Sequence, residues 1–135
     1  TKVAVPRSGR FRFMCFIAID RMIEGEAKQA AMAAFVADPF LKFAVIVDQD
    51  VDVYNDTAVL HAIATRVRAD RDIFMVPYAK GSPLDPASYD PAGGSHLVTK
   101  MGIDATRKDN YPAEISVPEA DTIDLTEFIP GYQKN

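Results

Sequence analysis

Residues 43–67 have the sequence FAVIVDQDVDVYNDTAVLHAIATRV, which contains the clearest strand and helix signals of the chain. Its first five residues, FAVIV, form a short apolar run rich in β-branched side chains, which is typical of a central strand. Capping residues at Asn55, Asp56 and Thr57 then precede apolar side chains spaced three and four residues apart. This spacing predicts an amphipathic helix over residues 56–67.

The same alternation continues on both sides of this stretch. Residues 11–19 (FRFMCFIAI) are apolar almost throughout, which predicts a strand buried on both faces. Residues 24–37 (EGEAKQAAMAAFVA) predict an Ala-rich helix that ends before Pro39, and residues 73–76 predict a third strand that ends at Pro77. Strand, helix, strand, helix, strand gives two right-handed crossover units. We therefore expect an α/β fold, a βαβαβ core with helices packed on a mostly parallel or mixed sheet.

Beyond Tyr78 the chain is rich in proline and glycine, and we expect much of it to be loop. The division that follows is an α/β domain over residues 1–108 and a Pro-punctuated C-terminal extension over residues 109–135. Residues 123–129 (IDLTEFI) predict a short helical turn, and such a tail is expected to dock on this body or on another chain. The candidate subunit contacts in it are its apolar side chains Ile123, Leu125 and Phe128.

The length, composition and charge of the chain exclude several classes of function. The chain has 135 residues, of which 48% are hydrophobic, and this is enough for one domain with a real core. The net charge of −4 argues against nucleic acid and anionic membrane surfaces as partners. No apolar run approaches the roughly 20 residues of a bilayer span, and Cys15 has no second cysteine to pair with. These features favour a cytoplasmic protein.

Asp48, Asp50 and Asp52 alternate along the chain, so an extended strand would place the three carboxylates on one face. One interpretation is a site for a hard metal ion, because such a cluster needs a cation or hydrogen-bond donors. The other interpretation, which we favour, is structural: the acids end the strand, help to cap the next helix and pair with nearby arginines.

Other familiar sites find little support in the sequence. An EF-hand loop starting at Asp48 needs glycine at its sixth position and glutamate at its twelfth, where this chain has Val53 and Val59. The segment after residue 19 lacks the glycine pattern of a dinucleotide site. With only His61 and His96 available as bases, the sequence does not favour a Ser-His or Cys-His hydrolase.

Four segments in fixed order resemble the C-terminal domain of the UbiD family of reversible, non-oxidative decarboxylases. They are VIVDQDVDVYNDTAVLHAIATRVRADRDI at 45–73, KGSPLDP at 80–86, KMGIDAT at 100–106 and, upstream, EGEAKQAAMAA at 24–34. The resemblance extends over about residues 10–107. It favours the structural interpretation of the three aspartates, since the matching segment in the family belongs to the fold of this domain.

The resemblance implies an enzyme that decarboxylates or carboxylates aromatic or unsaturated carboxylic acids with prenylated FMN, a divalent metal and potassium. In the family an Arg and two Glu from preceding domains perform the acid–base work, and no segment here matches those domains. We therefore expect no catalytic, cofactor-binding or metal-binding residue on this chain, and no activity from it in isolation. Its implied role is assembly and closure of the substrate pocket.

The implied partners are cofactor-bearing UbiD-like domains or a subunit, in a homo- or hetero-oligomer. The loops at 80–86 and 100–106 match those that face the pocket in the family. The candidate pocket-facing residues in them are Ser82, Leu84, Asp85, Lys100, Met101, Asp104 and Thr106. Two alternatives remain: a non-catalytic scaffold of the same fold, and a metal-binding α/β domain that uses the three aspartates.

Overall fold

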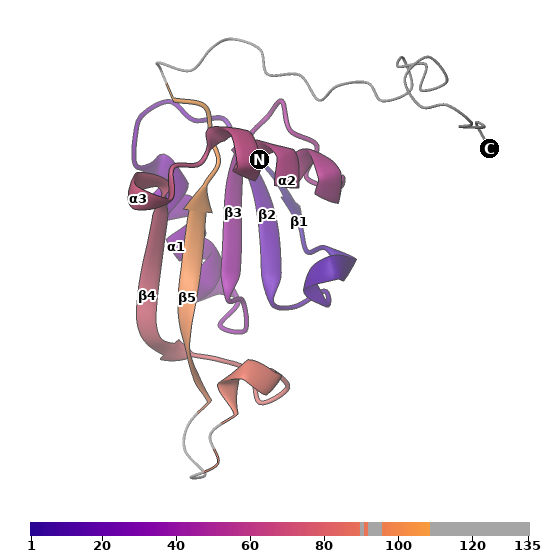
Figure 1. Cartoon of the computed structure of the whole chain (residues 1–135), viewed down its shortest axis with the longest axis vertical. Coiled ribbons are helices and arrows are strands. Elements are labelled where there is room, and N and C mark those ends of the chain that lie inside the picture. The colour runs from indigo at the N-terminus through magenta and orange to yellow at the C-terminus, as the bar shows by residue number, and fades with distance from the viewer. Residues whose placement is uncertain (90, 92–95, 109–135) are drawn as a thin grey trace, which may run out of the picture.

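The computed structural model describes residues 1–89, 91 and 96–108, which form one five-stranded sheet with helices on both faces (Figure 1). The strands are β1 (Lys2–Ala4), β2 (Met14–Ile19), β3 (Phe43–Asp48), β4 (Ile73–Lys80) and β5 (Leu97–Asp104). The helices are η1 (Arg7–Gly9), α1 (Glu26–Ala37), α2 (Asp56–Arg66), α3 (Ala69–Asp72) and η2 (Pro86–Ser88). In space the strands follow the order β1-β2-β3-β5-β4. The predicted α/β class is confirmed.

The core lies in two layers because β3 alternates between the two faces of the sheet. Val45 and Val47 join the cluster on the α2 side, whereas Ala44 and Ile46 join the cluster on the α1 side. All four side chains are buried, as expected for a central strand with helices on both faces. The α1 side is closed mainly by small alanines, and the α2 side by valines. Helices α1 and α2 therefore pack on opposite faces of the sheet and bury β3 between them.

The first crossover is confirmed and the second is not. β2 and β3 are parallel neighbours joined through α1, as the sequence predicts. β4, however, pairs antiparallel with β5, and β5 lies between β3 and β4 in parallel with β3. The connection through α2 therefore leads to an antiparallel edge strand rather than to a second parallel neighbour. The position between β3 and β4 is filled by residues 97–104, which were expected to be loop.

Two strand boundaries also differ from the prediction. β2 begins at Met14 rather than at Phe11, because Arg10 and Phe11 both adopt left-handed backbone conformations, with φ of 58° and 54°. Pro77 does not end β4, which continues to Lys80. Proline is tolerated there because β4 is an edge strand and the ladder shifts register between Val76 and Ala79.

A glycine sets the closeness of β4 and β5. Gly102 in β5 pairs with Phe74 in β4, and a Cβ built on Gly102 would lie 2.1 Å from Phe74 Cε1. The phenyl ring therefore occupies the space of the missing side chain.

In the part of the chain that the structure describes, no helix is long and apolar enough to cross a membrane.

Candidate functional site

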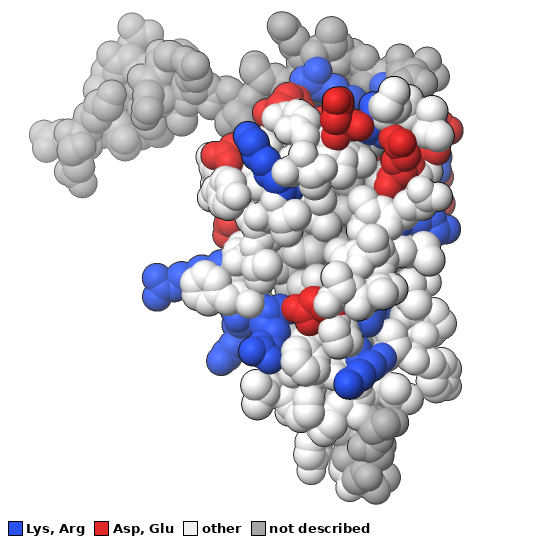
Figure 2. All heavy atoms as spheres, turned by 180° about the vertical axis from the view of Figure 1, so that it is seen from behind, with Lys and Arg blue, Asp and Glu red and all other residues white. Residues whose placement is uncertain are grey.

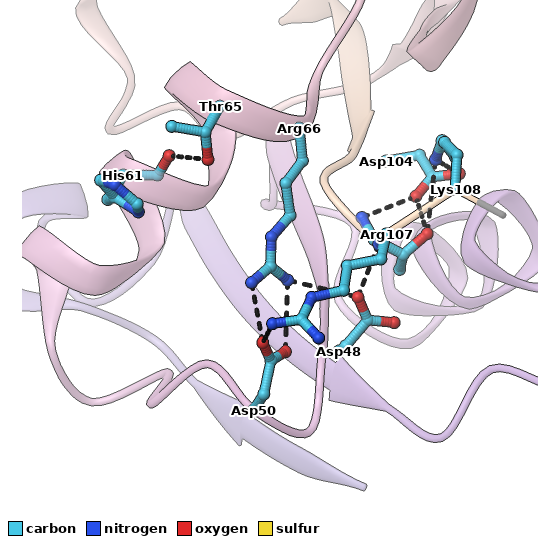
Figure 3. A network of polar contacts seen from close by, with 9 residues as sticks. Asp48, Asp50, His61, Thr65, Arg66, Asp104, Arg107 and Lys108 are labelled. Carbon is cyan, nitrogen blue, oxygen red and sulfur yellow. Dashed lines mark hydrogen bonds and ion pairs between the residues drawn. The ribbon is translucent and has the colours of Figure 1, made fainter. Parts of the chain in front are cut away.

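Charged side chains gather where the parallel strands end, and Figure 3 shows this network. Asp48 ends β3 and Asp104 ends β5, so their carboxylates lie at the same edge of the sheet. The last turn of α2 adds Arg66, and the segment after β5 adds Arg107 and Lys108. This edge is where α/β proteins commonly place their binding sites. We call it the carboxyl edge.

Arg66 holds the acidic segment after β3. Its Nη2 lies 2.8 Å from Asp50 Oδ2 and its Nη1 lies 3.2 Å from Asp50 Oδ1, while the same Nη1 reaches Asp48 Oδ2 at 3.3 Å. Arg107 adds an ion pair to Asp50 at 2.8 Å, and its backbone N–H donates to Asp48 Oδ2 at 2.6 Å. The hydrogen bonds from Arg66 hold the pKa of Asp50 below its usual range. The Asp50 carboxylate is therefore ionised at neutral pH.

A second group at the carboxyl edge is built on Asp72 and Asp104. Lys108 Nζ lies 2.7 Å from Asp104 Oδ2 and 3.7 Å from Asp72 Oδ1. Burial opposes ionisation of Asp72, but the Arg68 backbone N–H at 2.8 Å and the Arg71 guanidinium at 2.9 Å outweigh it. The net result is a lowered pKa for Asp72. A pocket of about 290 Å³ opens beside these ion-paired groups.

The three alternating aspartates do not converge on one point. Asp48 and Asp50 face the arginines, whereas Asp52 Oδ1 accepts a hydrogen bond from the Tyr54 backbone N–H at 3.0 Å. Within residues 1–89, 91 and 96–108, no group of three His, Cys, Asp or Glu side chains is arranged to hold a metal ion. The geometry therefore favours the structural interpretation. The helix cap itself is Asn55, whose side chain accepts from the N–H groups of Thr57 and Ala58, rather than Asp56.

The opposite edge of the sheet, which we call the amino edge, carries a compact loop after β4. Lys42 Nζ lies 2.8 Å from Asp85 Oδ2 and donates to Asp85 Oδ1 at 2.9 Å, in a largely buried ion pair. Asp85 also accepts from the Ala87 N–H, and the Ser88 hydroxyl bonds to the backbone oxygens of Ser82 and Asp85. These contacts attach residues 82–88 to the sheet and to one another. The sequence analysis did not find Lys42, because its partner lies 43 residues further along the chain.

Ser88 and His96 come together at this edge, which the sequence did not indicate. Ser88 Oγ lies 3.3 Å from His96 Nδ1. The hydroxyl is buried, and two backbone carbonyl oxygens lie 2.9 Å from it. Since a hydroxyl has one proton to donate, that proton is committed to the backbone. The pair stabilises the loop and does not form an activated nucleophile.

The predicted pocket-facing residues fall into two groups that do not meet. The amino edge holds Ser82, Leu84, Asp85 and Lys100, and the carboxyl edge holds Asp104 and Thr106, with Met101 between them on β5. Thr106 is buried, and its hydroxyl lies 2.6 Å from Asp104 Oδ1, so it shapes the turn after β5. Leu84 is 71% exposed, while its neighbours Ser82 and Asp85 are buried. The candidate subunit contacts Ile123, Leu125 and Phe128 lie outside the described residues.

Lys100 is a buried cation without a carboxylate partner in the described part of the chain. Its ammonium donates to the backbone oxygens of Pro39, at 2.7 Å, and Leu41, and it lies 5.4 Å from the centre of the Phe35 ring. Burial lowers the pKa of Lys100, and the charge of Asp38 opposes this effect. Lys100 thus fastens the segment after α1 to β5.

The chain is similar in sequence to a known domain family and to known decarboxylases. The family model "3-octaprenyl-4-hydroxybenzoate carboxy-lyase C-terminal domain" (UbiD_C) matches residues 1–105. The chain is 50% identical over 91 residues to the anhydromevalonate phosphate decarboxylase of Aeropyrum pernix, covering 67% of this chain and 20% of that protein. It is 35% identical over 114 residues to the gallate decarboxylase of Lactiplantibacillus plantarum, covering 78% of this chain and 23% of that protein.

A solved structure agrees with these relatives. The UbiD-class enzyme HmfF from Pelotomaculum thermopropionicum, in complex with FMN, superposes with a TM-score of 0.75 at 37% sequence identity. The match covers 94% of this chain and 28% of that chain. The chain spans about a fifth of the length of the decarboxylases it matches. It belongs to the UbiD family and corresponds to that family's C-terminal domain.

Proposed function

We propose that this chain is the C-terminal domain, or a separate small subunit, of a UbiD-like enzyme that decarboxylates an unsaturated or aromatic carboxylic acid. The observation that carries the proposal is the match of residues 1–105 to the C-terminal domain of the family, at about a fifth of the length of the decarboxylase relatives. The reacting groups and the prenylated FMN, with its divalent metal and potassium, then belong to the other domains. This chain contributes assembly and closure of the pocket.

The residues of this chain do not fit the metal centre of the family. The carboxylates at the carboxyl edge are engaged by Arg66, Arg107 and Lys108, so a metal would have to displace these cations. Asp85 at the amino edge is likewise paired with Lys42. We therefore derive no catalytic step on this chain, and its chemical contribution is to exclude water and to position other groups.

The loop over residues 82–88 has the features of a closing element. The Lys42–Asp85 ion pair and the Ser88 hydrogen bonds fix the loop, while the Leu84 side chain is exposed to solvent. A loop that is already ordered can cover a pocket with an apolar side chain at little cost in conformational entropy each time the domains close. We propose that Leu84 contacts the substrate pocket when the domains close.

The substrate class is a finer proposal. The relative that is 50% identical is an anhydromevalonate phosphate decarboxylase, whereas the gallate decarboxylase is 35% identical. This difference favours a phosphorylated acid over an aromatic one. The charged groups that select the substrate lie in the domains outside this chain, so the comparison rather than a residue of the site supports this choice.

A reconstitution experiment tests the function. The chain is assayed for carbon dioxide release from anhydromevalonate phosphate and from gallate, alone and together with the cofactor-bearing polypeptide. We expect no turnover from the chain alone and turnover from the combination. Turnover by the isolated chain, or no gain on mixing despite a stable complex, would contradict the enzymatic role; the second result would point to a scaffold.

Closure is tested in the same complex. Leu84→Ser should lower kcat/KM while the mass of the complex, measured by light scattering, stays the same. The matched control is Leu60→Ser, because Leu60 is an exposed leucine on α2, at 61% exposure, away from the amino edge. If the two variants have equal kcat/KM, Leu84 has no part in closing the pocket.

A further inference from the structure

An apolar groove of about 270 Å³ lies between α1 and the edge strand β4. Its lining includes Met32, Phe35 and Val36 from α1 and Val76 and Ala79 from β4, with Lys100 beside them. Val36 is 85% exposed and Met32 is 49% exposed, so the groove continues into an apolar surface. Figure 2, which views the molecule from the α1 side, shows a broad uncharged band between charged groups above and below. We call this feature the α1–β4 groove.

Two lysines give the groove a positive charge. Lys80 and Lys100 both line it, and the buried ammonium of Lys100 has no carboxylate partner among the described residues. It has used two of its three donors on backbone oxygens. Asp38 is the acidic group that influences Lys100, and it acts through its charge alone. The groove therefore suits a segment that combines apolar and acidic side chains.

The chain contains such a segment. Residues 109–135 include six acidic residues and one basic residue, whereas residues 1–108 include 13 acidic and 14 basic residues. In the sequence DTIDLTEFI, residues 121–129, the acids Asp121, Asp124 and Glu127 are interspersed with Ile123, Leu125 and Phe128. The charge and the apolar content of this segment complement those of the groove.

The starting point of the segment also favours the groove. Lys108, the residue before it, lies 3.7 Å from Asp72, and Asp72 directly precedes β4. Val76 and Ala79 follow along the same strand, at roughly 13 to 23 Å from Asp72. The residues between 108 and 123 span up to about 50 Å when extended, so the reach is ample. Docking within one chain also benefits from an effective concentration of about a millimolar or more.

We propose that residues 121–129 cover the α1–β4 groove of the same chain, with their apolar side chains in the groove and their acidic side chains facing Lys80 and Lys100. This assigns Ile123, Leu125 and Phe128 to the chain's own surface rather than to a neighbouring subunit. The apolar face between α1 and β4 is then covered when residues 109–135 are present.

The methyl group of Met32 reports on the groove, and that of the 86% exposed Met22, which is not among the groove-lining residues, serves as an internal reference. Methyl-labelled chains of residues 1–135 and 1–108 are compared by NMR. We expect the Met32 resonance to shift when residues 109–135 are removed and the Met22 resonance to stay in place. A peptide of residues 119–131 added to the shorter chain should move the Met32 resonance back. An unchanged Met32 resonance would overturn the proposal.

A charge variant in the groove provides the second test. Val36→Glu places an acidic side chain opposite the acidic segment, and the repulsion should keep the segment out of the groove. The Met32 resonance should then be the same in the Val36→Glu chain of residues 1–135 and in the Val36→Glu chain of residues 1–108. The matched control is Leu60→Glu, at another exposed apolar position on α2, which should leave the Met32 resonance of the full chain unchanged. If truncation also halves the mass seen by light scattering, the segment docks on a second copy, and the assignment to the same chain is wrong.

Discussion

Arg66 and Asp50 form a two-pronged ion pair that joins the end of α2 to the segment after β3. The two guanidinium nitrogens lie 2.8 and 3.2 Å from the two carboxylate oxygens. The Arg66 side chain is only 12% exposed, so water competes weakly for these hydrogen bonds. The chain passes from β3 into α2, and the end of α2 lies back near the end of β3. The Arg66–Asp50 pair therefore joins the two elements at the carboxyl edge.

Replacing Arg66 should therefore cost more stability than replacing a surface arginine. Arg66→Met removes both guanidinium hydrogen bonds to Asp50 and the one to Asp48, and we expect a loss of about 1–3 kcal/mol in the free energy of unfolding. Arg68→Met is the control, since Arg68 and its partner Asp70 are 65% and 68% exposed. The loss there should be within about 0.5 kcal/mol. Urea denaturation of both variants measures the difference, and equal losses would contradict the structural role of Arg66.

The lowered pKa of Asp72 gives the stability a dependence on pH. A carboxyl group whose pKa is lower in the folded state stabilises the fold above its unfolded pKa of about 3.9, and this contribution is lost as the pH falls through the folded pKa. Asp72→Asn should therefore be less stable than the parent at pH 7, by about 1–2 kcal/mol, because the Arg68 N–H and Arg71 bind the carboxylate.

The difference should shrink as the pH is lowered below 4. Unfolding of the Asp72→Asn chain and of the parent is measured in urea at several pH values between 7 and 3. Asp70→Asn is the control, because Asp70 is exposed and pairs with the exposed Arg68. Curves for Asp72→Asn and the parent that stay parallel over this range would show that the Asp72 carboxylate does not couple to folding.

Gly102 and Phe74 predict a pair of coupled substitutions. Gly102→Ala would place a methyl group 2.1 Å from a carbon of the Phe74 ring, so either the ring or the strand must move. We expect a loss of about 1–3 kcal/mol in the free energy of unfolding. The loss from Gly102→Ala should be smaller when Phe74→Leu is already present, because the smaller side chain vacates this space. A double-mutant cycle by chemical denaturation measures the coupling, and additive effects would rule out this contact.

The sequence predicted the elements around the first crossover well, because their patterns are local. The apolar run at β3, the Asn55 cap and the alanine face of α1 each lie within a few consecutive residues. The position of β5 could not be predicted in the same way. Its sequence, LVTKMGID, has a lysine that is buried through bonds to carbonyls from another segment, and a glycine covered by Phe74 of the neighbouring strand.

The candidate site shows the same limit. The pairing of the acidic segment with a nearby arginine was predicted, because a strand end and a following helix meet at one edge, and the structure shows that this arginine is Arg66. The separation of Asp85 from Asp104 was not, because it depends on β5 running the full height of the sheet between them. The late strand β5 lies between β3 and β4, and β4 therefore runs in the direction opposite to the expected one. Strand order is a long-range property that local periodicity does not contain.

Cys15 should be an inert thiol. It is 1% exposed in the cluster on the α1 side of the sheet, and burial, with a smaller contribution from the charge of Asp38, raises its pKa to about 11. At pH 8 only about one thiol in a thousand is then ionised, and the reagent must also reach it. We expect a disulfide reagent to label the native chain many times more slowly than the same chain in urea. Labelling of the native chain at the rate of the unfolded one would show that β2 opens readily, and the α1 layer would then not seal the sheet.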